Sequence, residues 1–269
     1  MKKFIFMAVA GMLALSSCSN DDNDVQTTQN APRQMTFTAG FGDEAQTRAA
    51  LDGSTKKVRF EAGDDISILS ANNTNTEFTT TEDGASVTFT GTATADSKFY
   101  AVYPYTDGLT LDPSTGIISG VEIPSSQFNA AVSTCGWDPR APIAYATTTG
   151  TSLQFHNACA LLKITNDKGE AAMIRVQCSN GALTGKFTLD TSNGTLSGID
   201  EETIPFASVT NVPLKKTIYI AIAPGTKTNF RATWIGADYN SYAGKEKSSF
   251  TFEAGKIYDL GETSEWEQY

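Results

Sequence analysis

The sequence predicts an all-β protein built from antiparallel sheets that pack as sandwiches. From Gln34 onward, apolar and polar residues alternate with a period of two, which is the pattern of half-buried strands. Such short runs recur along the chain and are separated by Gly, Asn, Asp, Ser and Pro. No stretch of about a dozen residues keeps a helical period, apart from a short turn near 158–162. Many short strands joined by regular turns are typical of β-sandwiches.

Residues 1–17 are predicted to be a secretory signal. Lys2 and Lys3 precede an apolar stretch at 4–15, and small residues follow it. The stretch is shorter than the roughly 20 residues that a membrane-spanning helix needs. The segment Leu15-Ser16-Ser17-Cys18 resembles a bacterial lipobox, in which the cysteine is acylated, although Ser17 replaces the more usual Gly or Ala. We therefore expect a lipid on Cys18; the alternative is a soluble secreted protein with a cysteine at its cleavage site.

Residues 18–33 are predicted to form an acidic, polar linker without a packed structure. The run at 19–24 contains three aspartates and resembles the signal that sends some lipoproteins of Gram-negative bacteria to the outside face. A solvated acidic tether would look the same. Two or three acyl chains would make the anchor effectively permanent, at about 0.8 kcal/mol per buried CH₂. We therefore expect the protein at the outer membrane, on the cell surface.

The first predicted strand follows the linker. In it, Met35, Phe37, Ala39 and Phe41 alternate with threonines and Gly40. Further strands are predicted at 58–60, 66–68, 87–89, 99–103, 153–155, 161–164, 174–178, 218–222, 230–234 and 250–252. The apolar-poor stretch 147–151 separates two strand-rich halves. We therefore expect an N-terminal sandwich at 34–148 and a C-terminal sandwich at 149–269, each near the common domain size of about 100–150 residues.

Charge and residue usage argue against enzymatic and nucleic-acid functions. The chain has a net charge of −10, and loss of Lys2 and Lys3 with the signal makes it −12. An acidic surface repels phosphate backbones. His156 is the only histidine, so a His-rich metal site is impossible, and no cysteine pair has zinc-finger spacing. Its apolar neighbours predict that His156 lies beside the core. We expect no enzymatic activity, no cofactor and no metal.

Six short motifs follow one another along nearly all of the mature chain. They are Leu51-Asp52-Gly53, Phe60–Ile68, Tyr100–Tyr105, Leu153–Ala160, Ile222–Gly225 and Ala254–Tyr258. Together, in this order, they resemble the Mfa-like fimbrillin family, whose members are subunits of type V pili. Two departures are visible: Cys159 replaces a small or apolar residue, and the chain ends at Tyr269, soon after the last motif.

The resemblance implies two tandem transthyretin-like (Greek-key) β-sandwich domains in a surface lipoprotein that is a structural or adhesive subunit of a pilus. The implied partners are other fimbrial subunits and a host or bacterial surface ligand. In the family, a protease cuts after an arginine, the first strand leaves, and a strand of a neighbouring subunit fills the groove. Arg48 follows the 35–41 strand and is the candidate cleavage site; the alternative is an ordinary surface arginine. Cleavage at Arg33 would keep the strand.

The donor strand is expected in the C-terminal stretch, with Phe250, Phe252, Ile257, Leu260 and Trp266 as its apolar residues. The alternative is that this stretch forms the last strand of its own domain, which the pattern favours for 250–260.

A second function also remains open: a monomeric or pilus-anchoring surface lipoprotein that binds glycan or protein ligands. The segment Trp137-Asp138-Pro139-Arg140 could form an exposed contact loop for such a ligand. Alternatively, it covers the edge of a domain.

Three cysteines remain after Cys18, at positions 135, 159 and 178. An exported protein permits a disulfide, and an odd number leaves one thiol free. Cys159 and Cys178 lie in neighbouring predicted strands and are the preferred pair. Buried free thiols are the alternative.

Overall fold

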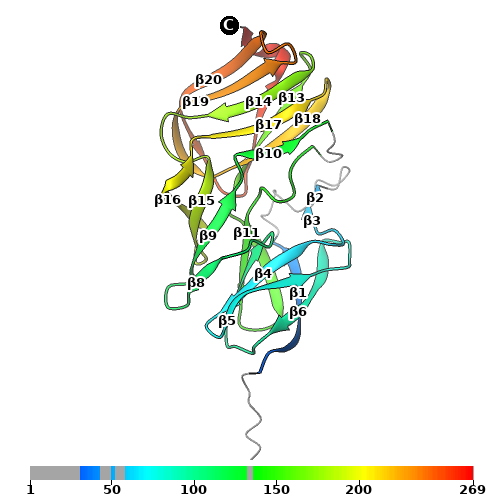
Figure 1. Cartoon of the computed structure of the whole chain (residues 1–269), viewed down its shortest axis with the longest axis vertical. Coiled ribbons are helices and arrows are strands. Elements are labelled where there is room, and N and C mark those ends of the chain that lie inside the picture. Colours follow the sequence, from blue (N-terminus) through cyan, green and yellow to red (C-terminus); the bar gives the residue numbers. More distant parts are fainter. Residues whose placement is uncertain (1–30, 43–49, 52–57, 132–135, 269) are drawn as a thin grey trace, which may run out of the picture.

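The computed structural model describes residues 31–42, 50–51, 58–131 and 136–268 of the chain (Figure 1). Strands make up nearly all of its regular structure, and one short 3₁₀ helix, η1 (Thr263–Glu265), is found in these ranges. The all-β class predicted from the sequence is therefore confirmed. No helix in the described part of the chain is long and apolar enough to cross a membrane.

The N-terminal sheet closes on itself into a barrel with the strand order β1-β12-β11-β7-β4-β5-β6. Its strands are β1 (Arg33–Phe41), β4 (Asp65–Ser70), β5 (Asn73–Thr79), β6 (Ser86–Ala93), β7 (Phe99–Tyr103), β11 (Ala144–Thr148) and β12 (Ser152–Asn157). The short strands β2 (Ala50–Leu51) and β3 (Val58–Arg59) pair separately. Closure leaves the barrel strands without free edges, which is one way in which β proteins avoid aggregation.

The barrel is filled by side chains from alternate positions of its strands, as the period-two pattern predicts. The core is rich in aromatic residues and includes Phe37, Phe60, Phe78, Phe89, Phe99, Tyr103 and Phe155. Gly91 on β6 shows how tight this packing is, because a Cβ atom there would lie 2.6 Å from the ring of Phe78. The ring rests on the bare backbone of the glycine, so this position requires the smallest residue.

The C-terminal half is a sandwich of two sheets around a second core. The six-stranded sheet has the order β10 (Ser126–Asn129), β17 (Phe206–Val212), β14 (Ala171–Gln177), β19 (Gly225–Gly236), β20 (Tyr242–Phe252) and β22 (Glu267–Gln268). The three-stranded sheet has the order β18 (Lys216–Ile222), β13 (Ala160–Asn166) and β21 (Ile257–Glu262). Apolar side chains of both sheets interdigitate between them, as in other sandwiches.

A four-stranded sheet lies between the barrel and the sandwich in Figure 1 and completes an elongated molecule. Its strands are β16 (Thr195–Ile204), β15 (Thr184–Asp190), β9 (Ile117–Ile123) and β8 (Thr110–Asp112). A third apolar cluster, which we call the middle cluster, joins residues such as Val102, Ile118, Phe187 and Ala221 from both halves of the chain. The amide of Gln127, which is buried, strengthens this connection, because it donates to Ala221 O at 2.6 Å and accepts from Ala221 N at 2.9 Å.

The expected division of the chain at residue 148 stays a prediction, but the sheets cross that point. β12 lies after it and is a barrel strand, whereas β9 and β10 lie before it and pair with β15 and β17 of the C-terminal half. Pairing between distant segments, rather than a break in the chain, therefore defines the layers.

Candidate functional site

The predicted first strand is β1, and it occupies an interior position in the barrel. It pairs antiparallel with β6, from Arg33↔Ala93 to Gly40↔Ser86, and parallel with β12, from Thr38↔Ser152 to Phe41↔Phe155. Its backbone is therefore paired on both sides from Thr38 to Gly40, and with β6 alone before Thr38. Removal of β1 would open the closed sheet and leave two unpaired edges, one on β6 and one on β12.

The inward face of β1 forms one wall of the aromatic core. Phe37 and Ala39 are completely buried, and Met35 and Phe41 are partly buried against the same cluster. The Phe37 ring meets Phe78 and Phe99 edge to face, with centroid distances of 5.4 Å and 5.1 Å. Such pairs add roughly 0.5–1.5 kcal/mol to the energy of area burial. The groove under β1 is therefore preformed, apolar and shaped for alternating large side chains.

The end of β1 is connected to a partly buried carboxyl group, that of Asp64, through a chain of rings. Phe41 stacks on Phe60 at 4.8 Å, and Phe60 meets the Tyr103 ring edge to face at 5.7 Å. The Tyr103 hydroxyl donates a hydrogen bond to Asp64 Oδ1 at 3.2 Å. Burial raises the pKa of Asp64, although hydrogen bonds from the Glu61 backbone and from Tyr103 oppose that effect.

The two predicted processing positions, Cys18 and Arg48, lie outside the described residues, as does Cys135. Lipidation at Cys18 and cleavage at Arg48 therefore stay predictions. Arg33, the second arginine considered, is exposed and opens β1 opposite Ala93.

The predicted donor stretch is folded into its own C-terminal sandwich. Phe252 and Trp266 are buried in that core, and Phe250 and Leu260 pack against it. Ile257 packs against the middle cluster and begins β21, which pairs parallel with β13. This arrangement matches the alternative that the sequence pattern favoured, in which 250–260 supplies strands of its own domain.

A network that we call the C-terminal latch, made of Asn166, Asp167, Thr263 and Ser264, holds the end of the chain. Asn166 is completely buried, and its Oδ1 accepts hydrogen bonds from the Trp234 indole at 3.0 Å and the Thr263 hydroxyl at 3.1 Å. The carboxylate of Asp167 accepts from the Ser264 backbone N–H at 2.7 Å and from the Ser264 hydroxyl. These bonds lower the pKa of Asp167. Release of the C-terminal strand would break the whole latch.

The predicted disulfide between Cys159 and Cys178 is wrong, because both residues are free thiols. β13 and β14, the strands next to them, lie in different sheets. Cys159 therefore joins the middle cluster, whereas Cys178 joins the sandwich core. Cys159 Sγ accepts from Ile143 N–H at 3.3 Å, and burial raises the pKa of this thiol to about 12. A thiol of that kind is unreactive at neutral pH.

The prediction that His156 lies beside the core is also wrong. It is exposed, because the alternation along β12 points Leu153 and Phe155 inward and His156 outward. The described residues contain no group of three or more metal-ligating side chains. Trp137 and Asp138 are buried, with only 5% and 4% exposure, so this segment covers an edge and does not present its tryptophan as a contact surface.

Sequence analysis missed a cleft on the open side of the C-terminal sandwich, between β20 and β21. No signal for it was present in the sequence, because strict alternation would place Lys245 and Lys247 on one face of a strand and Phe250 and Phe252 on the other. The structure brings all four side chains to the cleft. The alternation along the paired strand β19 breaks near Asn229, which has a positive φ of 48°.

Comparison with known proteins shows the fold but no family. No family model matches the chain, and no curated protein matches it. Two solved structures of proposed cell adhesion proteins are similar over most of both chains. That from Bacteroides uniformis has 15% identity and a TM-score of 0.54, and covers 87% of this chain and 95% of its own. That from Bacteroides ovatus has 12% identity and a TM-score of 0.52, and covers 89% and 96%.

A fimbrial protein from Bacteroides ovatus is also similar, with 13% identity and a TM-score of 0.40, over 84% of this chain and 48% of that protein. The first two likenesses cover most of both halves of this chain. The chain therefore has the fold of these two proposed adhesion proteins. The all-β sandwich fold that the sequence predicts is confirmed, with the difference that the N-terminal sheet closes into a barrel.

Proposed function

We propose that the protein is a structural or adhesive subunit of a cell-surface fimbrium, exported as a lipoprotein through Cys18 and assembled by protease-triggered strand exchange. One observation carries this proposal: β1 is an interior barrel strand over an aromatic groove, and the segment that contains Arg48 follows it directly. The shared fold with two proposed cell adhesion proteins supports it.

The energetics of β1 favour exchange over simple loss. Met35, Phe37 and Phe41 contribute about 1.5–3 kcal/mol each when buried, which is an upper estimate. Loss of the strand forfeits these contributions and leaves the facing backbone groups of β6 and β12 unpaired. An incoming strand restores both contributions by β-augmentation. It must run in the direction of β1 and place apolar residues at every second position.

The partner that fits is a strand of another fimbrial subunit. If the stretch Phe250–Trp266 acted as a donor, the end of β20 and the whole of β21 would have to leave their own sandwich. Trp266 would be exposed and the latch would be broken. We propose this stretch as the donor only in subunits whose latch has opened. No enzymatic step of its own is required of the chain, since a separate protease makes the cut.

The experiment is limited tryptic digestion of the mature chain, followed by N-terminal sequencing and size-exclusion chromatography. We expect cleavage after Arg48, a new N-terminus at Ala49, and oligomers that grow with time. Arg48→Gln is the control and should remain monomeric. Addition of a synthetic peptide with the sequence of 33–42 should refill the groove and suppress oligomers. Complete cleavage at Arg48 with persistent monomers would contradict strand exchange.

The second function, a monomeric surface lipoprotein that binds glycan or protein, is favoured by one specific observation. Tyr239 and Tyr242 are 66% and 41% exposed in and after the β19–β20 turn, and Leu214 in the β17–β18 turn is 47% exposed. Exposed aromatic rings on loops are suited to ligand contact. If Tyr239→Ala abolishes cell binding by a chain that is never cleaved, this second function holds.

A further inference from the structure

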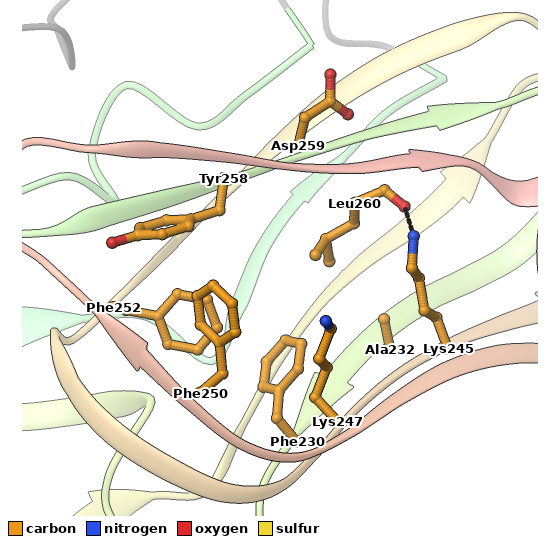
Figure 2. Close-up of a pocket in the computed structure, with 9 residues that line it drawn as sticks. All are labelled: Phe230, Ala232, Lys245, Lys247, Phe250, Phe252, Tyr258, Asp259 and Leu260. Atoms are coloured by element: carbon orange, nitrogen blue, oxygen red, sulfur yellow. Dashed lines mark hydrogen bonds between the residues drawn. The ribbon is translucent and has the colours of Figure 1, made fainter.

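A cleft of about 220 Å³ opens between β20 and β21, on one side of the C-terminal sandwich. Figure 2 shows aromatic side chains gathered at one end of it, with Leu260 and two lysine stems beside them. Phe250, Tyr258 and Leu260 are packed against the core but only partly buried. Apolar side chains that belong to a core therefore remain accessible here.

The aromatic end of the cleft is rigid and preformed. Phe252 contacts three other rings, with centroid distances of 5.1 Å to Phe230, 4.8 Å to Phe250 and 5.0 Å to Tyr258. The Tyr258 hydroxyl also accepts a hydrogen bond from Glu253 N at 2.8 Å, which ties the ring to the turn between the two strands. An apolar ligand would find these surfaces in place.

The cleft is open because β22, the strand next to β20, covers only a short part of that strand. β22 pairs with β20 only at Ala243 and Gly244, and β21 has β13 as its partner on one side. In the described part of the chain, no strand pairs with the free edge of β20 beyond Gly244.

The charges at the cleft lie at positions that normally face a core. Lys245 is opposite Ala232, and Lys247 is opposite Phe230, both of which are buried. Lys245 Nζ donates to Leu260 O at 3.1 Å, and Lys247 Nζ lies 6.0 Å from the Phe250 ring centroid. Among the described residues, neither ammonium group has a carboxylate within 4 Å.

The acidic side chain in the cleft wall, Asp259, is directly paired with a lysine outside the cleft. It forms an ion pair with Lys163 at 2.7 Å, and the charge of Lys245 acts on it only as a weaker cause of its lowered pKa. Two cations that no carboxylate in the described part of the chain contacts directly, on a protein of net charge −10, mark a local site for an anion. Next to them lies an aromatic surface, so the complementary molecule has one acidic end and one apolar end.

We propose that this cleft binds an anionic amphiphile, with its carboxylate between Lys245 and Lys247 and its unbranched chain on the aromatic surface. The cleft volume of about 220 Å³ leaves room for a chain of medium length. Strand exchange at β1 is not needed for this binding.

A short ligand fits better than an added β-strand. The bond from Lys245 to Leu260 closes one end of the cleft, and the contact of Tyr258 with Glu253 closes the other. A strand along β20 would also bury both lysines, and inward-facing lysines are a common protection of sheet edges against such pairing. That protective role alone is the competing explanation.

The test is isothermal titration of the mature chain with decanoate, with decanol as the neutral counterpart. We expect one saturable decanoate site that weakens at high salt, and much weaker binding of decanol. Lys247→Gln should weaken decanoate about fivefold and leave decanol unchanged. Lys186→Gln removes the same charge from a lysine that is paired with Glu202 in the four-stranded sheet, and it should have no effect.

A second variant tests the apolar surface with the charges intact. Leu260→Trp should fill the cleft and abolish binding, and circular dichroism should confirm that the variant is folded. Absence of saturable decanoate binding, equal affinity for decanol, or an unchanged affinity in Lys247→Gln would overturn the proposal. Binding of an extended acidic peptide that decanoate does not displace would overturn it as well, in favour of strand docking.

Discussion

β1 and β21 both lie near an end of the described chain and pair with strands that are distant in the sequence, but the two sheets depend on them differently. β1 has hydrogen-bonded neighbours on both sides and closes a barrel, whereas β21 is the edge of a three-stranded sheet and pairs with β13 alone. Release of β1 would therefore create a groove with two edges and a defined register. Release of β21 would only narrow its sheet.

The two regions are also held by different interactions. β1 is held by backbone ladders and aromatic packing, which any strand with the right alternation can replace. The C-terminal segment is held by the latch, whose hydrogen bonds depend on particular side chains of Asn166, Asp167, Thr263 and Ser264. Because of this difference, β1 is the strand that another subunit can replace, whereas the C-terminal segment is released only when the hydrogen bonds of the latch are broken.

The largest expected effect separates the buried barrel strand from the sandwich edge. Phe37→Ala should lower the free energy of unfolding by about 3–5 kcal/mol, because it empties a completely buried site. Leu260→Ala, at a partly exposed position, should cost less than about 2 kcal/mol. Urea denaturation of both variants gives the comparison. Thr38→Ala, on the exposed face of β1, is the control and should change little.

Equal losses for Phe37→Ala and Leu260→Ala would show that the two strands are equally embedded. The position of a strand inside the barrel or at the edge of a sheet would then not affect how much its apolar side chain contributes to the free energy of unfolding.

A smaller effect is expected in the latch. Thr263 is completely buried, and its hydroxyl bonds both Asn166 and the backbone N–H of Asp167. Thr263→Val keeps the shape and leaves these partners unsatisfied, so it should cost about 1–3 kcal/mol. Thermal unfolding measures the loss, with Thr90→Val on the exposed face of β6 as the control. If both variants melt alike, the latch does not hold the C-terminal segment.

Much of β1 was predictable from the sequence, because strand alternation is a local property. The pattern from Met35 to Phe41 correctly placed Phe37 and Ala39 inside and the threonines outside. The same rule applied to β12 would have placed His156 outside, next to an inward Phe155. Its apolar neighbours in the sequence misled the prediction, since neighbours along a strand face opposite sides.

The parts that could not be predicted depend on distant pairing. The parallel pairing of β1 with β12 joins Thr38 to Ser152, and no local pattern encodes that choice. The disulfide prediction failed for the same reason, because Cys159 and Cys178 flank strands of two different sheets. The core-facing positions of Lys245 and Lys247 on β20 were not predictable either, because they follow from the pairing of these residues with Ala232 and Phe230 of β19.

The smallest expected effect distinguishes the two regions by the sign of their pH dependence. Burial raises the pKa of Asp64 beside the barrel core, whereas hydrogen bonds from Ser264 lower the pKa of Asp167 in the latch. A raised folded-state pKa means that ionised Asp64 opposes folding at neutral pH. That penalty disappears as the pH falls from its folded pKa toward its unfolded value of about 3.8. Wild type should therefore gain stability relative to Asp64→Asn on acidification over this range.

The latch should respond in the opposite direction. The contribution of Asp167 is complete above its unfolded pKa of about 3.8 and is lost as the pH falls through its lower folded pKa. Ser264→Ala removes the largest cause of that shift, so its destabilisation should be greatest near neutral pH and shrink below about pH 3.8. Urea denaturation from pH 7 to pH 3 measures both trends. If the loss of unfolding free energy in Asp64→Asn and in Ser264→Ala changed with pH in the same direction, acid would act on the barrel and on the latch alike. Acid could then not open the latch selectively, and it would be excluded as the means of releasing the C-terminal stretch as a donor.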